Sequence, residues 1–526
     1  MNFPRGDDAL DTDQDDFDVI IIGGGLTGLS AAYHLARKRA NLSVMIIEAT
    51  DSLGGRLKSG EHFHLFVHTF QNNMTQLLRE MKIETEAGEQ CDDKNRVFCD
   101  ENGPVRSLPS FLAAQVYYCM KSLNESSLDE RLESSENNEE FRILAELSAV
   151  DLINRMVVSP KAKSICASLI SLTCGENFPL IVETFSSIVS DFMKCNYFSG
   201  FTELNNISAL WLLTVFHRAG GFFQRLKFFL NSNSRYFIKG GNSILLQRLT
   251  KRILDENVTI NCLETANKIT FDEYRKFVST NAQTYKCSYV IVAISPPRSG
   301  QLTLESFPEN YEKSQSCYVS TRLIRFESNY RNNFWHPDHS GTIVPLLSNG
   351  PSQLKLIQDT THPPGNEIKT LSGYFWASDA DNELSRSLQL SRTLRQCFNH
   401  IAEHSHVNFY EEVETKGLMS VLTPSSIQNH VNLLRTPCRR VFFAASEYSG
   451  RWPGTADGAV EAGEHAACLV LNDVRPQTLT RSQIVKFIPA KPRTRESSFE
   501  VWMTTTVLLF ANFMIFWPFC RKAYGF

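Results

Sequence analysis

The chain has 526 residues with a formal net charge of −4, and 42% of the residues are hydrophobic. A single hydrophobic core rarely grows beyond about 250 to 300 residues, so this length predicts two domains. The charge balance provides no basic surface for nucleic acid, which argues against a nucleic-acid partner. The 13 cysteines are odd in number and include no CxxC pair. This argues against a disulfide framework and a zinc site, and favours a reduced protein facing the cytosol.

The N-terminal segment, residues 1–16, is acidic and contains no long apolar run. It therefore lacks the features of a secretory signal and of an arginine-rich transit peptide. We predict a disordered leader over these residues.

The first predicted strand is the apolar run VIII at residues 19–22, as expected for a parallel strand buried on both faces. The glycines that follow, Gly23, Gly25 and Gly28, have the GxGxxG spacing, and a helix is predicted over residues 26–39. The first glycine permits a tight turn, the second lets a pyrophosphate approach the backbone, and the third lets the helix pack on the strand. A phosphate is favoured at the helix N-terminus by its free N–H groups. A glycine-rich turn without a ligand is the alternative.

A second apolar strand, VMIIE, ends in Glu48, twenty residues after Gly28. A carboxylate at this distance can accept hydrogen bonds from a ribose hydroxyl. The sequence DSLGGR follows at residues 51–56. Gly55 there allows close approach of the backbone, and Arg56 can pair with a pyrophosphate. For the GGR sequence alone, a surface turn with a solvated arginine is the alternative.

Three histidines, His62, His64 and His68, follow at short spacing. Two histidines at i and i+2 share one face of a strand, but no third ligand type is evident nearby, so no metal site is predicted. The polar segment at residues 122–140 cannot bury much apolar area, and we predict that it is a surface elaboration.

A third motif lies near the C-terminus. The apolar strand VFFAA ends just before Glu447, which is placed to bind the ribityl or pyrophosphate part of a nucleotide. A helix is predicted to start between Gly454 and Gly458, and Ala456 at this start is a candidate residue for binding a cofactor. The N–H groups at such a helix start can face the edge of a flavin on which reduction leaves negative charge. An ordinary amphipathic helix after a strand is the alternative for this motif alone.

Together these motifs resemble the flavin-containing amine oxidase family, and monoamine oxidases in particular. Further matching stretches are SALWLL at 208–213, FIKGGNSILLQRL at 237–249 and YVIVAISPP at 289–297. The resemblance implies an α/β fold with a Rossmann-like FAD-binding domain and an α+β substrate domain. It also implies FAD as the cofactor, a small-molecule amine and O2 as substrates, and a homodimer as one possible assembly.

The resemblance implies that each domain is assembled from separate stretches of the chain. The FAD-binding domain is expected from residues 17–90, 235–303 and 410–475, and the substrate domain from residues 91–234 and 304–409.

At the flavin ring the chain departs from the family pattern. In monoamine oxidases a cysteine is bonded to the flavin, two tyrosines wall the path of the amine, and a lysine holds a water near the ring. The cysteine corresponds to Leu418, so FAD is expected to be bound non-covalently. The tyrosines correspond to Met419 and Thr455, and the lysine to Arg322, which gives the expected catalytic positions.

Two more differences concern the surroundings of the ring. The glycines that follow GGR in the family are replaced by EHFH at residues 61–64. Tyr374, Phe375 and Trp376 are candidate replacements for the aromatic walls, and the alternative is that they pack within a sheet of the substrate domain. Two functions therefore stay open: an FAD-dependent amine oxidase with a reshaped pocket, and a catalytically silent, flavin-binding or flavin-free scaffold.

The C-terminal segment at residues 501–520 carries no charge and is flanked on both sides by basic residues. Its length is sufficient to cross the hydrocarbon core of a bilayer as a helix. We predict a linker at residues 476–497 and a transmembrane tail anchor at residues 498–522, and a buried core helix is the alternative. The family resemblance points to the mitochondrial outer membrane with the body in the cytosol, and the endoplasmic reticulum is the second choice.

Overall fold

The structure is a computed structural model of the chain. It describes residues 16–38, 40–57, 66–87, 97–100, 103–104, 108–132, 139–174, 207–230, 235–272, 275–320, 323–335, 343–345, 352–361, 367–377, 382–398, 406–411, 420–424 and 430–486. The chain divides into two compact units, Met1–Thr480 and Arg481–Phe526. Both predicted domains fall within the first unit, and the boundary between them stays a prediction.

The larger sheet is built around β1 (Asp16–Ile22). β2 (Val44–Ile47) and β11 (Thr284–Val292) flank β1 as parallel neighbours, while β8 (Thr259–Asn261) pairs with β2 and β20 (Val441–Phe443) with β11. The last four side chains of β1 are at most 4% exposed. The predicted parallel strand buried on both faces is thus confirmed, and strand β20 from the far end of the sequence completes the parallel part of the sheet.

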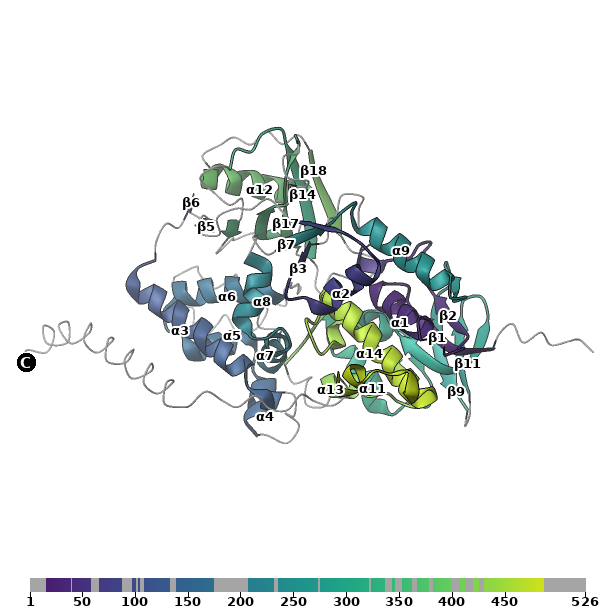
Figure 1. Ribbon diagram of the computed structural model, residues 1–526. Helices are drawn as coiled ribbons and strands as arrows, with labels where there is room; N and C mark the ends of the chain where they lie inside the picture. The colour runs from purple at the N-terminus through teal and green to yellow at the C-terminus, as the bar shows by residue number, and fades with distance from the viewer. Residues whose placement is uncertain are drawn as a thin grey trace, which may run out of the picture. The chain divides into compact units, whose positions relative to one another are not determined.

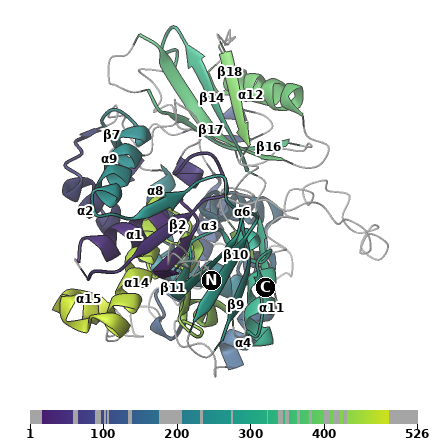
Figure 2. The same cartoon turned by 90° about the vertical axis from the view of Figure 1, so that its right-hand side faces the viewer.

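An antiparallel extension shares the outer edge of β11 with β20. It consists of β10 (Lys276–Thr280), β9 (Ala266–Phe271) and the short β12 (Thr303–Leu304), which pairs with β9 in parallel. Figure 2 shows β9, β10 and β11 side by side. The sheet therefore mixes a parallel half, which carries the glycine loop, with an antiparallel half that does not.

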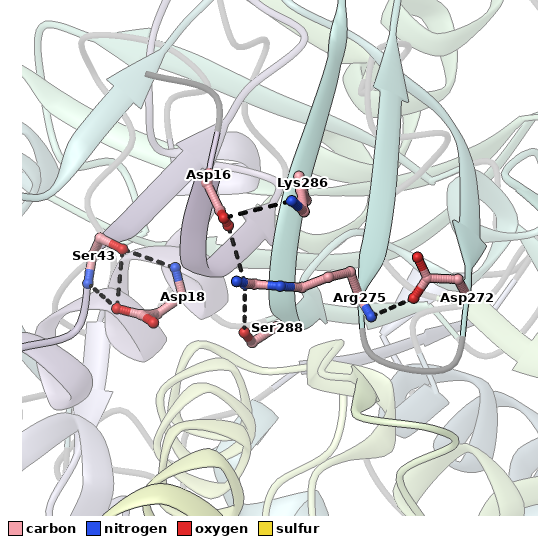
Figure 3. Close-up of polar contacts among 7 residues, drawn as sticks. All are labelled: Asp16, Asp18, Ser43, Asp272, Arg275, Lys286 and Ser288. Carbon is pink, nitrogen blue, oxygen red and sulfur yellow. Dashed lines mark hydrogen bonds and ion pairs between the residues drawn. The ribbon is translucent and has the colours of Figure 1, made fainter. Parts of the chain in front are cut away.

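Polar contacts fix the register at the amino end of β1 (Figure 3). Asp16 contacts Nη1 of Arg275 at 3.1 Å and Nζ of Lys286 at 4.0 Å, and Arg275 also donates to Oγ of Ser288. These ion pairs are partly exposed, and such pairs contribute about 0 to 1 kcal/mol each. They align β1, β11 and the residue before β10 more than they stabilise the fold.

Two helices from opposite ends of the sequence pack together, α1 (Leu26–Ala36) and α14 (Ala456–Val474) (Figure 1). At their contact, a Cβ atom on Gly463 would clash with the carbonyl oxygen of Thr27. Oγ of Ser30 donates to the carbonyl oxygen of Val460 at 3.0 Å. The helix that follows the glycine loop is thereby held directly against the helix of the C-terminal motif.

A second sheet has seven strands and a core of its own. In spatial order the strands are β18 (His406–Glu411), β14 (Leu323–Tyr330), β17 (Lys369–Ala377), β16 (Ser352–Asp359), β15 (Ile343–Pro345), β5 (Val97–Asp100) and β6 (Gly103–Pro104). Helix α12 (Glu383–Phe398) contacts β16, β5 and β6. Phe375 is fully buried in this core against the ring of Phe326, so it packs within the sheet and is not an aromatic wall.

Several helices surround an extensive core that also includes residues of the larger sheet. They are α3 (Ser110–Ser127), α4 (Glu139–Glu146), α5 (Ala149–Met156), α6 (Pro160–Cys174), α7 (Ala209–Arg218) and α8 (Phe222–Leu230). The expectation that residues 122–140 contribute no core is wrong, because Leu123 and Leu132 are 0% and 4% exposed in this cluster. α3 runs into the polar segment and buries Leu123, whereas Leu132 is buried beyond the end of α3.

Further elements are described as well, of which α15 (Arg481–Lys486) belongs to the second unit and the others to the first. They are α2 (Asn72–Glu80), α9 (Asn242–Leu254), α10 (Pro296–Ser299), α11 (Glu309–Ser316), α13 (His430–Arg435), α15, the three-stranded sheet β3 (Phe66–His68), β7 (Arg235–Ile238) and β4 (Thr85–Ala87), and the pair β13 (Tyr318–Ser320) and β19 (Ser420–Leu422). In its described part, residues 476–486, the predicted linker contains a 3-10 helix, Pro476–Thr478, and the short helix α15.

Within the described part of the chain, no helix is both long enough and apolar enough to cross a bilayer. The predicted tail anchor at residues 498–522 lies outside the described residues.

The contact between α1 and α14 generates a stability prediction. Gly463→Ala should lower the free energy of unfolding by about 1 to 3 kcal/mol, because the added methyl overpacks the interface, although alanine favours a helix over glycine by about 1 kcal/mol. Urea denaturation followed by far-UV circular dichroism measures the change. Gly25→Ala is the control, since its Cβ would meet no atom within 4 Å. A Gly463→Ala variant as stable as the wild type would contradict this close approach.

Candidate functional site

The glycine loop turns directly from β1 into α1. Gly23 has φ +107°, which favours glycine, and its N–H donates to the carbonyl oxygen of Ile47 at 2.8 Å. A Cβ atom on Gly28 would clash with the carbonyl oxygen of Gly23, so α1 can start this close to the strand only with glycine there. A Cβ on Gly25 would meet nothing within 4 Å. Gly23 and Gly28 are required by the protein's own packing, and Gly25 faces open space at the helix N-terminus.

Glu48 is fixed beside this loop at the end of β2. One carboxylate oxygen accepts from the N–H of Gly24 at 2.6 Å, and the other accepts from the N–H and Oγ1 of Thr50 at 2.8 and 2.9 Å. A carboxylate has about four acceptor positions, so one more hydrogen bond can be accepted. The side chain is therefore oriented by the loop and still able to accept from a ribose hydroxyl.

The GGR sequence lies alongside the glycine loop. The N–H of Gly54 donates to the carbonyl oxygen of Gly24 at 2.9 Å, and Gly25 and Gly54 form an isolated parallel bridge. Gly55 (φ +52°) then begins a short 3-10 helix, Gly55–Leu57, that presents Arg56. Backbone pairing thus places the arginine next to the glycine loop.

Arg56 connects these two motifs to the C-terminal one. Its guanidinium lies 2.9 Å from Oε1 and 3.3 Å from Oε2 of Glu447, and it donates to Oγ of Ser446 at 3.0 Å. The Glu447 side chain is 1% exposed and that of Arg56 is 25% exposed. The structure therefore brings together three motifs, and the two that this ion pair joins are 391 positions apart.

Helix α14 starts at the same place. Thr455 is its N-cap, where the hydroxyl accepts from the N–H of Gly458 at 3.3 Å and donates to the carbonyl oxygen of Trp452 at 2.7 Å. Ala456 is the first residue of the helix. Free N–H groups at a helix start favour an anion. These hydrogen bonds show that Thr455 stabilises the start of α14. Its role toward a substrate stays a prediction.

Two features of the site were not predicted from the sequence. The rings of His68, Phe70 and Trp452 form a stack, with centroid distances of 4.8 Å for the first pair and 5.0 Å for the second. Asp457, in the first turn of α14, is 1% exposed and accepts from the first turn of α2. Burial raises the pKa of Asp457, and the hydrogen bonds it accepts oppose that rise. No local spacing signals contacts between residues more than 380 positions apart.

Several predicted positions lie outside the described residues, namely Arg322, Leu418, Met419 and the EHFH sequence at 61–64. Their expected places at the ring remain predictions. His68 is buried in the aromatic stack. In the described ranges, no group of three or more His, Cys, Asp or Glu side chains is arranged to hold a metal ion.

Comparison with known proteins agrees with this geometry. The profile of a family described as flavin containing amine oxidoreductase matches residues 26–471 of the chain. The chain belongs to this family. Family members are oxidoreductases that depend on flavin, and the cofactor is FAD.

Similar family members cover nearly the same length. The chain is 23% identical to the flavin-containing amine oxidase A of Canis lupus familiaris, over 87% of this chain and 85% of the relative. It is 24% identical to the flavin-containing amine oxidase B of Bos taurus, over 86% of each. Among solved structures, cyclohexylamine oxidase from Brevibacterium oxydans superposes with a TM-score of 0.71 at 18% identity, over 87% of this chain and 99% of that one. A putrescine oxidase with bound putrescine gives a TM-score of 0.70 at 18% identity and the same coverage.

The described residues are compatible with FAD. The open face at Gly25 and the oriented carboxylate of Glu48 suit the adenosine and pyrophosphate part, and the start of α14 suits an anionic edge of the flavin. Bound FAD would supply a two-electron acceptor for oxidation of an amine. The residues named above would hold the dinucleotide part of the cofactor.

The open space at Gly25 generates a binding prediction. Gly25→Ala should lower the stability of the apoprotein by no more than about 1 kcal/mol, because its Cβ meets no protein atom and only the preference of the N-cap for glycine over alanine is lost. Its affinity for FAD should fall by about tenfold or more, since the methyl occupies space expected for the pyrophosphate, and each 1.4 kcal/mol corresponds to tenfold. Titration of apoprotein with FAD, followed by flavin fluorescence, measures the dissociation constant. Asp18→Ala, near the opposite end of β1, is the control with unchanged affinity, and an unchanged affinity in Gly25→Ala would place the cofactor elsewhere.

Proposed function

We propose that the protein is a membrane-anchored, FAD-dependent amine oxidase that binds its cofactor non-covalently. In the proposed reaction a hydride leaves the carbon beside a neutral amine nitrogen for FAD, O2 then takes up the electrons to give H2O2, and the imine hydrolyses to an aldehyde. The convergence of the glycine loop, the GGR sequence and the C-terminal motif at the pair of Arg56 and Glu447 supports this proposal. A dinucleotide site assembled from segments far apart in the sequence is compatible with catalysis of this kind.

The residues proposed at the ring differ from the family pattern in ways that slow the reaction. With Met419 and Thr455 in place of two tyrosines, the slot that aligns a small amine loses rigid aromatic walls. Misplacement of a substrate by about 1 Å can cost on the order of a hundredfold in rate. Arg322 adds a fixed positive charge that repels a cationic amine before it loses its proton, but favours the negative charge of the reduced cofactor. We therefore expect a bulkier or less basic amine as the substrate.

A second candidate function is a catalytically silent, FAD-binding scaffold at the membrane. The observation in its favour is that Thr455 uses its hydroxyl both as donor and as acceptor in capping α14. Together with Leu418 and Met419, this leaves three ring-side positions without the family's functional groups.

Spectroscopy of the purified full-length protein tests the proposal. We expect a flavin absorbance spectrum, with all flavin released into the supernatant on acid precipitation, because Leu418 cannot form a thioether bond. Under anaerobic conditions in a stopped-flow instrument, simple arylalkylamines should bleach this flavin on the order of a hundredfold more slowly than in efficient enzymes. A bulkier or less basic amine in the panel should bleach it faster.

Each other outcome has a definite meaning. Flavin that stays with the precipitated protein contradicts non-covalent binding. Rapid bleaching by simple arylalkylamines shows that the ring-side residues have been misassigned. Binding of FAD with no bleaching by any amine supports the FAD-binding scaffold, and failure to bind FAD contradicts the oxidase and supports a flavin-free scaffold.

We also propose that residues 498–522 anchor the protein in a membrane after synthesis. The uncharged stretch with basic flanks supports this, and the family resemblance favours the mitochondrial outer membrane over the endoplasmic reticulum.

Truncation tests the anchor. A chain that ends at Ser498 should move from the membrane fraction to the soluble fraction with FAD affinity unchanged, as measured by fractionation and flavin titration. The full-length double variant Leu508→Lys and Leu509→Lys is a matched control that keeps the length of the chain. It should also leave the membrane fraction, since each lysine at the centre of the segment costs about 2.5 to 3.5 kcal/mol for insertion. Persistence of the truncated chain in the membrane fraction would refute a single anchor.

A further inference from the structure

The loop in front of α14 is held in one conformation. Trp452 has φ +53°, a left-handed conformation that a bulky side chain adopts only where its surroundings fix it. Its N–H donates to the carbonyl oxygen of Arg218 at 3.2 Å, its carbonyl oxygen accepts from Thr455, and its ring stacks on Phe70. A rigid loop thus delivers the helix start that faces the proposed cofactor.

Asp457 connects this helix start to a second one. Its Oδ1 accepts from the N–H of Met74 at 2.8 Å, and its Oδ2 accepts from Nδ2 of Asn73 at 2.9 Å. Asp457 lies in the first turn of α14, and both donors lie in the first turn of α2. The described N-cap of α2, Gln71, makes no side-chain capping bond. The carboxylate of Asp457 therefore caps α2 from another helix.

The start of α2 determines where β3 lies. Between them is a tight turn in which the N–H of Gln71 donates to the carbonyl oxygen of His68 at 2.9 Å, and Oε1 of Gln71 accepts from the N–H of His68 at 3.0 Å. This turn carries the aromatic stack that reaches Trp452. Displacement of α2 from α14 would therefore move β3 and the stack as well.

We propose that Asp457 is a positioning residue of the FAD site. It fixes the start of α2, and with it β3 and the turn to Gln71, against the start of α14, and so sets the space in which the flavin is held. This role rests on the proposed function, because it requires that FAD binds beside the start of α14.

Two substitutions separate positioning from charge. Asp457→Ala removes both acceptors, whereas Asp457→Asn keeps one oxygen for the N–H of Met74. Removal of hydrogen bonds to a charged group should raise the dissociation constant for FAD by about tenfold or more in the alanine variant, with a smaller rise in the asparagine variant. The visible circular dichroism of bound flavin should change in the same order.

Asp151→Ala is the matched control. Asp151 also accepts at the start of a helix, from the N–H and Oγ of Ser148 at 3.1 and 2.7 Å, but it belongs to α5. Its loss should lower the free energy of unfolding because a helix start loses its acceptor, as in Asp457→Ala. The FAD dissociation constant and the flavin signal should stay unchanged.

Hydrogen exchange of the apoprotein supplies a readout that does not require the cofactor. Amides of residues 66–74 should exchange faster in Asp457→Ala than in the wild type, and Asp151→Ala should leave them protected. If the alanine variant does not fold, the asparagine variant decides the FAD affinity. Wild-type affinity and flavin dichroism in a folded variant with rapid exchange at 66–74 would overturn the positioning role, whereas a wild-type protein that binds no FAD would overturn the proposed function itself.

Discussion

Glu447 carries a carboxylate that is almost completely removed from water, and such a charge is tolerated only beside a cation and hydrogen-bond donors. Arg56 and Ser446 supply these contacts. Loss of one partner of a buried pair costs about 3 to 5 kcal/mol, because the other charge is left uncompensated. The remaining geometry of the nucleotide site depends on this contact, since it attaches the C-terminal motif to the GGR sequence and, through Gly54, to the glycine loop.

Helix α14 and its N-cap residue make several contacts that hold the site together. Gly463 lets α14 approach α1, Asp457 caps α2, and Thr455 caps α14 itself. All three contacts are made by protein groups with one another, so they can persist when residues at the ring change. This explains how the chain retains the fold of the family at 23% identity while its expected ring-side residues differ.

Local patterns were enough to predict the nucleotide-binding half of the fold. The apolar run at 19–22 specified β1, and the glycine spacing specified a turn whose conformation at Gly23 and packing at Gly28 the structure requires. Contacts between segments far apart in the sequence leave no comparable pattern in the local sequence. Asp457 looked like any acidic residue in a first helical turn, and its acceptor role exists only because α2 begins nearby. The polar segment at 122–140 was misjudged for a related reason, since its average composition concealed Leu123 and Leu132, whose burial depends on neighbouring helices.

The parallel pairing of β20 with β11 and the packing of α14 against α1 also have a consequence for synthesis. The glycine loop leaves the ribosome early, but α14 ends at Val474, more than 400 residues after the end of α1. At about 5 to 20 residues per second, that interval lasts roughly 20 to 90 s. During this time α1 lacks the helix that buries one of its faces and Arg56 lacks its carboxylate partner. The nascent chain therefore exposes an unfinished nucleotide fold, and a chaperone that shields α1 until release would have its greatest effect on this stage.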